Sequence, residues 1–247
     1  MIELRADLHI HTCLSPCGDL DMTPKRILKK AKEVGLDLIA VTDHNACGNV
    51  EVAQSIGEEL GIQVMAGMEV TSKEEVHLLG IFGEVQRAKE LEEVLHKGLK
   101  IQNDPEIFGY QVLVNEKDEV EGFVSPLLIS ASHLSLEEVL RKVHELGGLC
   151  IAAHVDKPSY SIISQLGFIP KALELDAVEV WDISHYLTLL NQGYGLEGFT
   201  VVYGSDSHFL HQLGGRYTKI MVEDPSFYEL SLALRNQEGR RAWVEGS

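Results

Sequence analysis

Short apolar runs recur along this chain, at residues 38–41, 149–153 and 199–203, and each is followed at once by polar residues. Uninterrupted runs of this length are typical of strands that are buried on both faces of a parallel sheet. Residues 2–9 alternate between apolar and polar positions, which also indicates a strand. Further strands are predicted at residues 63–70, 77–82, 175–181, 217–222 and 241–245.

Helical patterns separate most of these strands. Thr23 and Pro24 are the residue types of an N-cap and a first-turn proline, and they predict a helix that ends near Gly35. The further helices are predicted from a cap at Asn49 to about residue 60, over 85–97, from the capping-box residue Ser135 to Gly147, and over 226–235.

The alternation of strands and helices predicts one α/β domain over residues 1–247, with a parallel sheet. About seven such units, with polar residues gathered after the strands, favour a closed or nearly closed barrel, whose chemistry lies at the carboxyl ends of the strands. A doubly wound open sheet is the alternative, weakened because no glycine-rich phosphate-binding fingerprint follows the first strand. Residues 101–134 break the rhythm, with a strand at 111–114 and a turn at 115–118, and are interpreted as an insertion over the site.

The composition, 45% hydrophobic, 24% charged and 6% aromatic over 247 residues, is ordinary for a globular protein with a full core. The formal charge of −17 disfavours a protein that grips a nucleic-acid backbone over a broad surface, because such binding needs a basic face. A small phosphorylated substrate, or a short or nucleotide-like piece of nucleic acid, stays compatible with a pocket that holds divalent cations. No membrane-spanning run and no secretory leader are found, so a cytoplasmic location without a membrane partner is expected.

Four cysteines, Cys13, Cys17, Cys47 and Cys150, are too few and too unevenly spaced for a disulfide scaffold. Three of them lie near histidines, but without a fourth close by they do not favour an iron–sulfur cluster. Cys150 lies inside an apolar run and is interpreted as a small buried hydrophobic residue.

Side chains that bind metals recur where the apolar runs end. His9 and His11 are two positions apart on a predicted strand, so both can face one side and chelate one ion. Asp206 and His208 repeat this spacing after the strand at 199–203. Burial of so many ionisable groups is unfavourable unless cations pair them, so the pattern predicts a cluster of divalent metal ions. The candidate ligands are His9, His11, either Cys17 or Asp19, His44, Glu69, His77, His154, Asp206 and His208.

Glu69 follows an apolar strand that carries no other charge. A carboxylate that bridges two ions explains this position better than a salt bridge with a distant cation. His77 and His154, each beside an apolar strand, are interpreted as completing the shell of a second ion. Asp43 and Asp7 are interpreted mainly as carboxylates that orient metal-bound imidazoles, because such support is common.

These motifs occur together in an order that resembles a known family. The segments are Asp7-Leu8-His9-Ile10-His11-Thr12, Thr42-Asp43-His44-Asn45, Gly67-Met68-Glu69-Val70 with His77, Ala153-His154 and Gly204-Ser205-Asp206-Ser207-His208. The set, which spans residues 7–208, is similar to the successive motifs of the PHP (polymerase and histidinol phosphatase) family. The resemblance implies a distorted (β/α)7 barrel of TIM-like form, up to three metal ions and phosphoesterase chemistry, but it does not choose the substrate.

The resemblance also implies how the ligands are divided. It places one ion on His9, His11, Glu69 and Asp206, a second on Glu69, His77 and His154, and a third on His44 and His208. Family members usually supply one more ligand to the third ion from the loop after the two histidines, where this chain has Cys17 and Asp19. A thiolate would favour zinc and an aspartate would leave manganese or iron open, and the sequence does not decide between them.

The expected mechanism is direct attack on phosphorus by a metal-bound hydroxide, because two or three clustered divalent ions lower the pKa of bound water. No G-x-S-x-G elbow is present, so a side-chain nucleophile is not predicted. Asp43, His208 or a metal-bound water is the candidate for protonating the leaving group. Lys157 and Arg216 follow ligand-bearing strands and are candidates for binding the phosphate, with Arg216 favoured because a guanidinium can contact phosphate through two N–H groups.

The leading hypothesis is therefore a hydrolase of phosphoric esters, a phosphatase or a phosphodiesterase, that acts on a small metabolite or a nucleotide. An amidohydrolase-like metal hydrolase is a second possibility, although such enzymes usually carry a carbamylated lysine at a strand end, which no predicted strand shows. A third is a metal-supported binding or regulatory module, in which the 101–134 insertion contacts a partner. The oligomeric state is not determined by these patterns.

Overall fold

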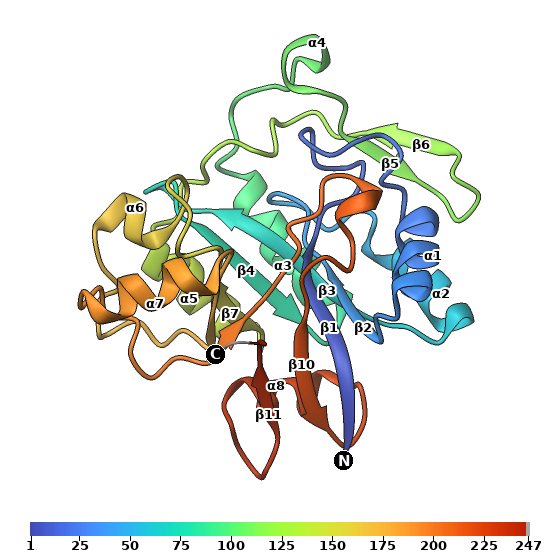
Figure 1. Cartoon of the computed structure of the whole chain (residues 1–247). Helices are drawn as coiled ribbons and strands as arrows, with labels where there is room; N and C mark the ends of the chain where they lie inside the picture. The colour runs from blue at the N-terminus through green and yellow to red at the C-terminus, as the bar shows by residue number, and fades with distance from the viewer. Residues whose placement is uncertain (246–247) are drawn as a thin grey trace.

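A barrel-shaped sheet of nine strands forms the centre of the structure, a computed structural model that describes residues 1–245 (Figure 1). In spatial order its strands are β11 (Arg241–Trp243), β10 (Thr218–Val222), β1 (Ile2–Ile10), β2 (Leu38–Val41), β3 (Gln63–Thr71), β4 (His77–Phe82), β7 (Leu149–Ala152), β8 (Ala177–Glu179) and β9 (Val201–Val202). The helices are α1 (Pro24–Val34), α2 (Val50–Leu60), α3 (Val85–His96), α4 (Pro105–Phe108), α5 (Leu136–Glu145), α6 (Ile162–Leu166), α7 (Ile183–Asn191) and α8 (Phe227–Leu234). A separate hairpin joins β5 (Val112–Val114) to β6 (Val120–Phe123), and residues Leu210–Gln212 form a 3₁₀ turn.

The sheet closes almost completely into a barrel. Its two edge strands are β9 and β11, and Thr218 at the start of β10 reaches across to the chain just after β9. The Thr218 hydroxyl donates to the carbonyl of Tyr203 at 3.0 Å and accepts the N–H of the same residue at 2.8 Å. One side chain thus satisfies two backbone groups that a further strand would otherwise pair. The predicted nearly closed α/β barrel is confirmed, and the open-sheet alternative is wrong.

Two strands run against the direction predicted for a purely parallel sheet. β4 is antiparallel to β3 and β7, and β10 is antiparallel to β1 and β11. For β4 the reason is chain length, since residues 72–76 are too few for the crossover that a parallel pair requires. The antiparallel direction of β4 also places a candidate metal ligand. It brings His77, the first residue of β4, beside Thr71 and close to Glu69 near the end of β3.

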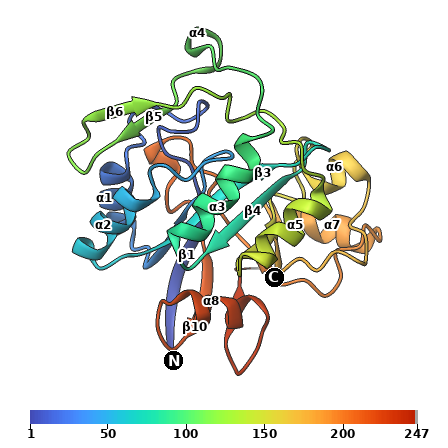
Figure 2. The same cartoon turned by 180° about the vertical axis from the view of Figure 1, so that it is seen from behind.

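Apolar side chains fill the barrel at the end opposite these polar residues. Leu8, Ala40 and Ile151 pack inside the barrel with Leu230 and Leu234 of α8. α8 therefore closes the end from which β1 starts, at the bottom of Figure 1. A second apolar layer packs between the sheet and the outer helices, such as α3 and α5 beside β4 (Figure 2). The barrel is a packed core at one end and a polar cluster at the other, as expected of α/β barrels.

The helices predicted from capping signals are present. Thr23 accepts the N–H of Arg26 at the start of α1, and Gly35 ends that helix at φ 75°, in the left-handed region. Ser135 and Glu138 form the predicted capping box of α5, with hydrogen bonds of 2.8 and 3.3 Å. The two helices between β7 and β9, α6 and α7, were not predicted. Within residues 1–245, no helix is both long enough and apolar enough to span a bilayer.

Asn49 precedes α2, but its side chain does not cap that helix as predicted. Its amide nitrogen donates to the Thr12 hydroxyl at 2.9 Å and to the Val112 carbonyl at 3.0 Å, and its oxygen accepts the N–H of Val114 at 3.2 Å. The side chain is engaged by β5 and by the loop after β1. Asn49 therefore ties the insertion to the barrel.

The 101–134 insertion carries α4 and the β5–β6 hairpin, and it lies at the end of the barrel where β1 finishes, the top of Figure 1. Its return segment reaches the site. The amide of Asn45, just after β2, donates to the carbonyls of Leu128 and Ser130 at 2.7 and 3.0 Å, and Ile129 between them lines the cavity described below. Residues 127–130 of the insertion therefore lie beside this cavity.

We expect the substitution Asn49→Ala to destabilise the protein by about 1–3 kcal/mol, because it leaves buried partners on Thr12, Val112 and Val114 without hydrogen bonds. Denaturant unfolding measures the loss, and hydrogen exchange should be faster in β5. Ser55→Ala is the matched control, since its exposed hydrogen bond to Glu116 also joins α2 to the insertion. Equal stability of the two variants would contradict an anchoring role for Asn49.

Candidate metal centre

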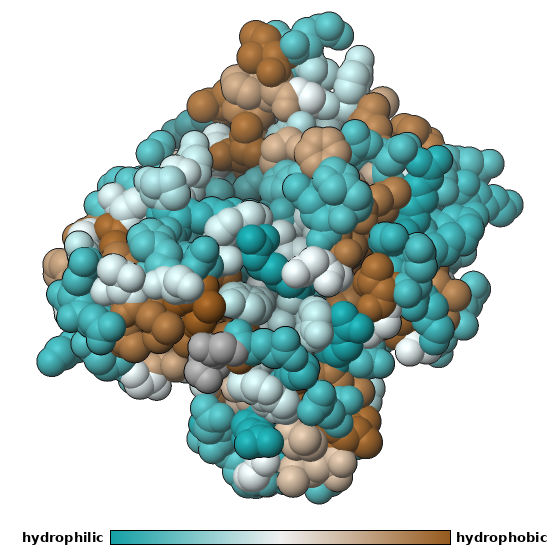
Figure 3. Space-filling view, in the orientation of Figure 1, coloured by the Kyte–Doolittle hydropathy of each residue, from teal (hydrophilic) through white to brown (hydrophobic). Residues whose placement is uncertain are grey.

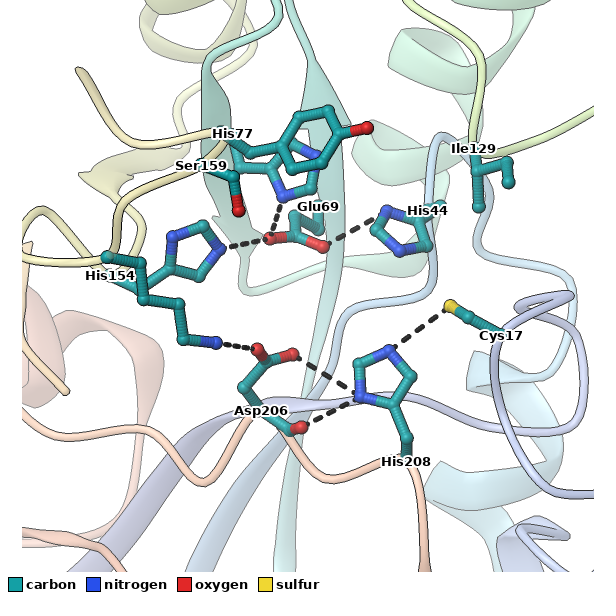
Figure 4. A pocket seen from close by; sticks show the side chains of 11 residues that line it. Cys17, His44, Glu69, His77, Ile129, His154, Ser159, Asp206 and His208 are labelled. Atoms are coloured by element: carbon teal, nitrogen blue, oxygen red, sulfur yellow. Dashed lines mark hydrogen bonds and ion pairs between the residues drawn. The ribbon is translucent and has the colours of Figure 1, made fainter. Parts of the chain in front are cut away.

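The side chains predicted as metal ligands converge on one cavity at the carboxyl end of the parallel strands (Figure 4). They come from β1, from the loops after β1, β2, β7 and β9, from the last part of β3 and from the start of β4. The cavity has a volume of about 280 Å³. Seven of the predicted ligands line it, namely Cys17, His44, Glu69, His77, His154, Asp206 and His208, and fully buried His9 and His11 contact them from behind.

Glu69 lies at the centre of this cluster and is only 1% exposed. Both of its oxygens face imidazoles (Figure 4). Oε1 lies 2.7 Å from His77 Nδ1, 3.2 Å from His154 Nε2 and 3.3 Å from His9 Nε2, and Oε2 lies 3.0 Å from His44 Nδ1 and 3.4 Å from His11 Nε2. A carboxylate with nitrogen donors around each oxygen has the arrangement of a ligand that bridges two ions.

His9 and His11 present their Nε2 atoms to each other. Glu179 accepts a hydrogen bond from Nδ1 of His9 at 2.9 Å. The Ser15 hydroxyl donates to Asp43 at 2.7 Å, so its oxygen is left to accept from Nδ1 of His11 at 2.9 Å. Both Nε2 atoms then carry lone pairs, and they lie 3.2 Å apart. Two lone pairs at this distance repel each other, so a cation, either an added proton or a metal ion, must lie between them.

Other nitrogens of the cluster are also free to bind metal. Nδ1 of His208 contacts the Asp206 carbonyl at 2.8 Å, which leaves its Nε2 available. Nδ1 of His44 and of His77 is buried without a hydrogen-bond partner, although each lies within 3.0 Å of a Glu69 oxygen. Three sets of ligand atoms lie within 4.8 Å of one another: His9, His11 and Asp206; His44, Glu69 and His77; and His11, His44 and His208. The donor set therefore fits divalent cations held by nitrogen and oxygen.

The electrostatics of the cluster favour the protonation states that metal ligands need. Burial and the neighbouring His208 lower the pKa of His11 to about 4, and burial lowers the pKa of His44 well below its ordinary value. Although burial opposes its charge, the imidazoles of His77, His9 and His44 hold the pKa of Glu69 well below its ordinary value. Neutral imidazoles and an ionised carboxylate are the forms that coordinate metals.

The pKa of His9, unlike those of His11 and His44, is raised. Burial opposes its charge, but Glu179, Glu69 and Asp206 together hold the pKa of His9 well above its ordinary value. In the metal-free protein the added proton therefore resides on His9, and it can fill the space between His9 and His11. A metal ion held by these two nitrogens would have to displace this proton, so metal binding would compete with protonation.

Glu179 was not predicted, although the signal for it was present. It is the last residue of β8, 2% exposed, and it accepts from His9 through both oxygens at 2.9 and 3.0 Å and from the N–H of His154 at 2.9 Å. The same argument that singles out Glu69, a lone carboxylate that ends an apolar strand, applies to Glu179. Its contacts fix the ring of one predicted ligand and the backbone of another.

Asp43 was predicted as a possible proton donor to the leaving group, but its side chain does not line the cavity. It is fully buried and accepts from the N–H and hydroxyl of Thr12 and from Ser15, each at 2.7 Å. Its influence on His11 passes through Ser15. Burial raises the pKa of Asp43, and these hydrogen bonds oppose that shift. Of the two predicted proton donors, His208 is the one that lines the cavity.

Asp7 was predicted to orient an imidazole, but its carboxylate accepts hydrogen bonds from backbone N–H groups instead. Its Oδ1 accepts the N–H groups of Ser205 and His9 at 3.0 and 3.3 Å, so it joins the loop after β9 to β1. Burial raises the pKa of Asp7 to about 7, despite these hydrogen bonds. Asp7 positions the backbone that carries two of the predicted ligands.

Cys17 and Asp19, the two candidate ligands in the loop after β1, lie in different positions relative to the cavity. Cys17 lines the cavity, and its Sγ lies 3.1 Å from Nε2 of His208. Asp19 is exposed, does not line the cavity, and accepts the N–H of Asp21 at 2.8 Å. Burial, followed by the carboxylate of Glu69, raises the pKa of the Cys17 thiol, which makes it a poor nucleophile in the metal-free protein.

The two predicted phosphate-binding cations lie in different places. Lys157 lines the cavity, and its Nζ lies 2.5 Å from Asp206 Oδ2. Arg216 does not line this cavity: its guanidinium stacks 3.6 Å from the ring centre of Trp181, and its Nε donates to the Trp181 carbonyl. It borders a separate surface pocket with Tyr203. The structure therefore does not support the preference for Arg216 over Lys157 as the phosphate-binding residue, because Arg216 lies outside this cavity. The contact of Arg216 with Trp181 was not predicted from the sequence.

Two predicted ligands have unusual backbone conformations. His154 and Asp206 have φ of 32° and 48°, in the left-handed region that non-glycine residues rarely adopt. His154 comes two residues after the end of β7 and Asp206 four residues after the end of β9, and their side chains contact Glu69 and Lys157. Such strain persists where surrounding contacts impose it, and it is common at functional sites.

The comparisons with known proteins agree with this geometry. The model of the PHP domain family matches residues 7–197. The chain belongs to the PHP domain family. An uncharacterized protein of Methanocaldococcus jannaschii is 31% identical over 197 residues, which are 76% of this chain and 87% of that protein.

Solved structures show the same fold. Endonuclease Q from Pyrococcus furiosus matches with a TM-score of 0.69 and 20% identity over 98% of this chain, and this chain spans 58% of that longer protein. A two-domain protein of Bacteroides vulgatus, described as containing a predicted PHP-like metal-dependent phosphoesterase, matches with a TM-score of 0.55 and 18% identity, over 98% of this chain and 65% of that one. The fold is that of the PHP-family metal-dependent phosphoesterases.

We expect Glu179→Gln to weaken metal binding by about 10- to 100-fold, because the neutral amide has only one acceptor oxygen where the carboxylate accepts from both His9 and the N–H of His154. Metal titration followed by calorimetry measures the affinity. Glu174→Gln, which removes an exposed carboxylate shortly before β8, is the control and should bind metal as the wild type does. Wild-type affinity in Glu179→Gln would show that His9 needs no carboxylate partner.

Proposed function

We propose that this PHP-family chain is a metal-dependent phosphoesterase that hydrolyses a phosphate ester of a small metabolite or of a nucleotide. The observation that carries the proposal is the Glu69-centred cluster of nitrogen and oxygen donors on the wall of a cavity that also holds one lysine. Hydrolysis of a phosphate ester needs cations for the phosphate oxygens and an activated water, and this donor set with its lysine could supply both.

The proposed division of ligands is the one that the family resemblance implies. His9, His11, Glu69 and Asp206 would hold one ion, Glu69, His77 and His154 would hold a second, and His44 and His208 would belong to a third position; contacts of these side chains with one another support the proposal. Bound divalent ions supply an activated water at neutral pH and neutralise phosphate oxygens. The surrounding residues orient the donors: Glu179 holds the ring of His9, and Ser15 holds that of His11.

Lys157 is the proposed phosphate-binding residue. In the metal-free protein its ammonium pairs with Asp206, which is also a proposed metal ligand. If Asp206 held a metal ion, its charge would be taken up by that ion, and Lys157 would be free to contact a phosphate oxygen in the same cavity. The ring of Trp181, 4.1 Å from Nζ, keeps the ammonium near the site.

The size and charge of the site support a small substrate. A cavity of about 280 Å³ is at the lower end of the range for small-molecule sites and accepts one phosphate with a modest organic group. Ile129 and Tyr160, the latter stacked on His77, line the cavity and offer apolar contacts to that group. Hydrophilic residues cover much of the face seen in Figure 3, with hydrophobic patches near α4 and elsewhere, and the formal charge is −17. A broad grip on nucleic acid is disfavoured by this charge.

A phosphate ester within a nucleic acid is the alternative substrate, and the likeness of the fold to a nuclease is the reason to test it. Endonuclease Q has also been solved with a duplex that carries an abasic lesion at its active site, and that structure matches this chain with a TM-score of 0.65 and 21% identity. The likeness concerns the fold alone. The substrate class is therefore tested directly.

We expect protein reconstituted with Mn²⁺, Zn²⁺ or Fe²⁺ to hydrolyse an aryl phosphomonoester or phosphodiester, and a His9→Ala, His11→Ala double variant to lose at least about two orders of magnitude of this activity. A His185→Ala, His211→Ala double variant, in which both histidines are exposed, should keep it. A parallel assay with a 5′-phosphorylated oligonucleotide and with an abasic duplex identifies the ester class. Metal binding without turnover of any of these esters would contradict the proposal and favour a binding module.

We expect Lys157→Ala to raise KM about tenfold or more for the ester that is turned over, because a charge-assisted hydrogen bond to phosphate is lost. Metal content should not fall, since Lys157 competes with metal for Asp206. Steady-state kinetics and elemental analysis measure both quantities. Lys171→Ala, at an exposed position, is the control. An unchanged KM would remove Lys157 from substrate binding.

A further inference from the structure

The chain between β7 and α6 brings an ammonium, a hydroxyl and an aromatic ring to the wall of the cavity. They belong to Lys157, Ser159 and Tyr160, which all line it. The hydroxyl of Ser161 donates to the carbonyl of Lys157 at 2.7 Å, and the N–H of His77 donates to the carbonyl of Tyr160 at 2.8 Å. These two hydrogen bonds fix the segment to the start of α6 and to β4.

The ring of Tyr160 is supported on one side and remains largely open. It stacks on the imidazole of His77, with the ring centroids 4.7 Å apart and an angle of 18° between the two planes. Tyr160 is nevertheless 45% exposed. Aromatic rings favour offset-stacked partners, so this ring is available to a flat group that enters the cavity.

The backbone of Tyr160 has a conformation that is unfavourable for a tyrosine. Its φ is 56°, in the left-handed region where glycine is the usual residue. The chain nevertheless carries a large aromatic side chain at this position. Conformations of this kind are common where a side chain is held at a ligand site.

The protein itself does not use the hydroxyl groups of Ser159 and Tyr160. Within residues 1–245, neither hydroxyl has a hydrogen-bond partner in the protein, and that of Ser159 points into the cavity (Figure 4). Ser159 is therefore available to donate to an oxygen of a substrate near Lys157. Removal of the Tyr160 hydroxyl, in turn, costs the protein no hydrogen bond.

The rest of the cavity wall narrows the choice of organic group. Among the described residues that line the cavity, only Ile129 and Tyr160 present an aliphatic side chain or a benzene ring. A sugar gains few hydrogen bonds from these two side chains, whereas a flat ring can stack on one and contact the other. The volume of about 280 Å³ has room for one ring and a phosphate, since an apolar cavity of about 150 Å³ holds benzene.

We propose that Tyr160 selects phosphate esters whose alcohol carries a flat aromatic ring, which stacks on Tyr160 beside Ile129 while Lys157 and Ser159 contact the phosphate. The inference rests on the proposed function and deepens it, because it names the class of ester for the same cavity. Tyr160 determines specificity and takes no part in bond cleavage. The ring belongs either to an aromatic alcohol or to the base of a nucleotide, which share the flat face that Tyr160 contacts.

Binding of phosphonates tests this contact without turnover, because their carbon–phosphorus bond is not hydrolysed. Benzylphosphonate and cyclohexylmethylphosphonate differ mainly in that only the first has a flat ring. We expect the metal-loaded wild-type protein to bind the benzyl compound about three- to tenfold more tightly by calorimetry. This preference should disappear in Tyr160→Ala and persist in Tyr160→Phe, which keeps the ring. Tyr110→Ala is the matched control and should keep the preference, because Tyr110 is 43% exposed but lies outside the cavity.

A second pair of compounds identifies the source of the ring. Thymidine 5′-phosphate and 2-deoxyribose 5-phosphate differ by the presence of the base. Initial rates of hydrolysis that favour the thymidine ester in the wild type, but not in Tyr160→Ala, would assign the ring to a nucleotide. A preference that depends on Tyr160 only in the phosphonate pair would assign it to an aromatic alcohol.

The absence of a ring preference in both pairs, or a preference that Tyr160→Ala keeps, would overturn the inference. A purely structural role of Tyr160 behind His77 would lower metal content or weaken both phosphonates equally, and the ratio of their affinities would not change. Elemental analysis measures the metal content. Ester hydrolysis without ring preference would contradict this inference alone, and ring-selective phosphonate binding without hydrolysis of any ester would contradict the phosphoesterase alone.

Discussion

Burial of the Glu69 carboxylate among imidazoles is the constraint on which the site and much of the barrel depend. A carboxylate that is 1% exposed is strongly unfavourable unless cations or hydrogen-bond donors surround it. Its partners come from five places in the sequence, and they are His9, His11, His44, His77 and His154. The nearly closed barrel brings these positions to one end, and the antiparallel direction of β4 is what adds His77.

The residues behind this cluster decide which nitrogen of each ring is free. Glu179 takes Nδ1 of His9, Ser15 takes that of His11, and the Asp206 carbonyl takes that of His208. All three Nε2 atoms are thereby left for other partners. Since a ring that binds metal must present one unprotonated nitrogen in a fixed direction, these hydrogen bonds prepare the site before any ion arrives. The hydrogen bonds that orient the histidine rings therefore contribute to the metal centre as much as the candidate ligands do.

Local signals in the sequence identified most of this arrangement, and long-range contacts account for what they missed. The strand ends, the caps at Thr23 and Ser135 and the predicted ligands depend on residues close in sequence, so their patterns are readable. The side chain of Asn49 was misassigned because its partners lie 63 and 65 residues away in β5. Arg216 was misplaced for the same reason, since Trp181 lies 35 residues away. Glu179 is different, because its local signal, a carboxylate that ends an apolar strand, was present and was overlooked.

The structure separates the part that binds metal from the part that limits access. α8 and its apolar partners close one end of the barrel, and Thr218 closes its side, so the donors are mounted on a rigid frame. Buried hydrogen bonds of Asn45 and Asn49 join the insertion to that frame, together with backbone hydrogen bonds and apolar contacts. Only its 127–130 segment reaches the cavity, through Ile129. Changes in this segment would therefore alter which organic group is admitted without moving the donors, so substrate choice can vary on an unchanged metal centre.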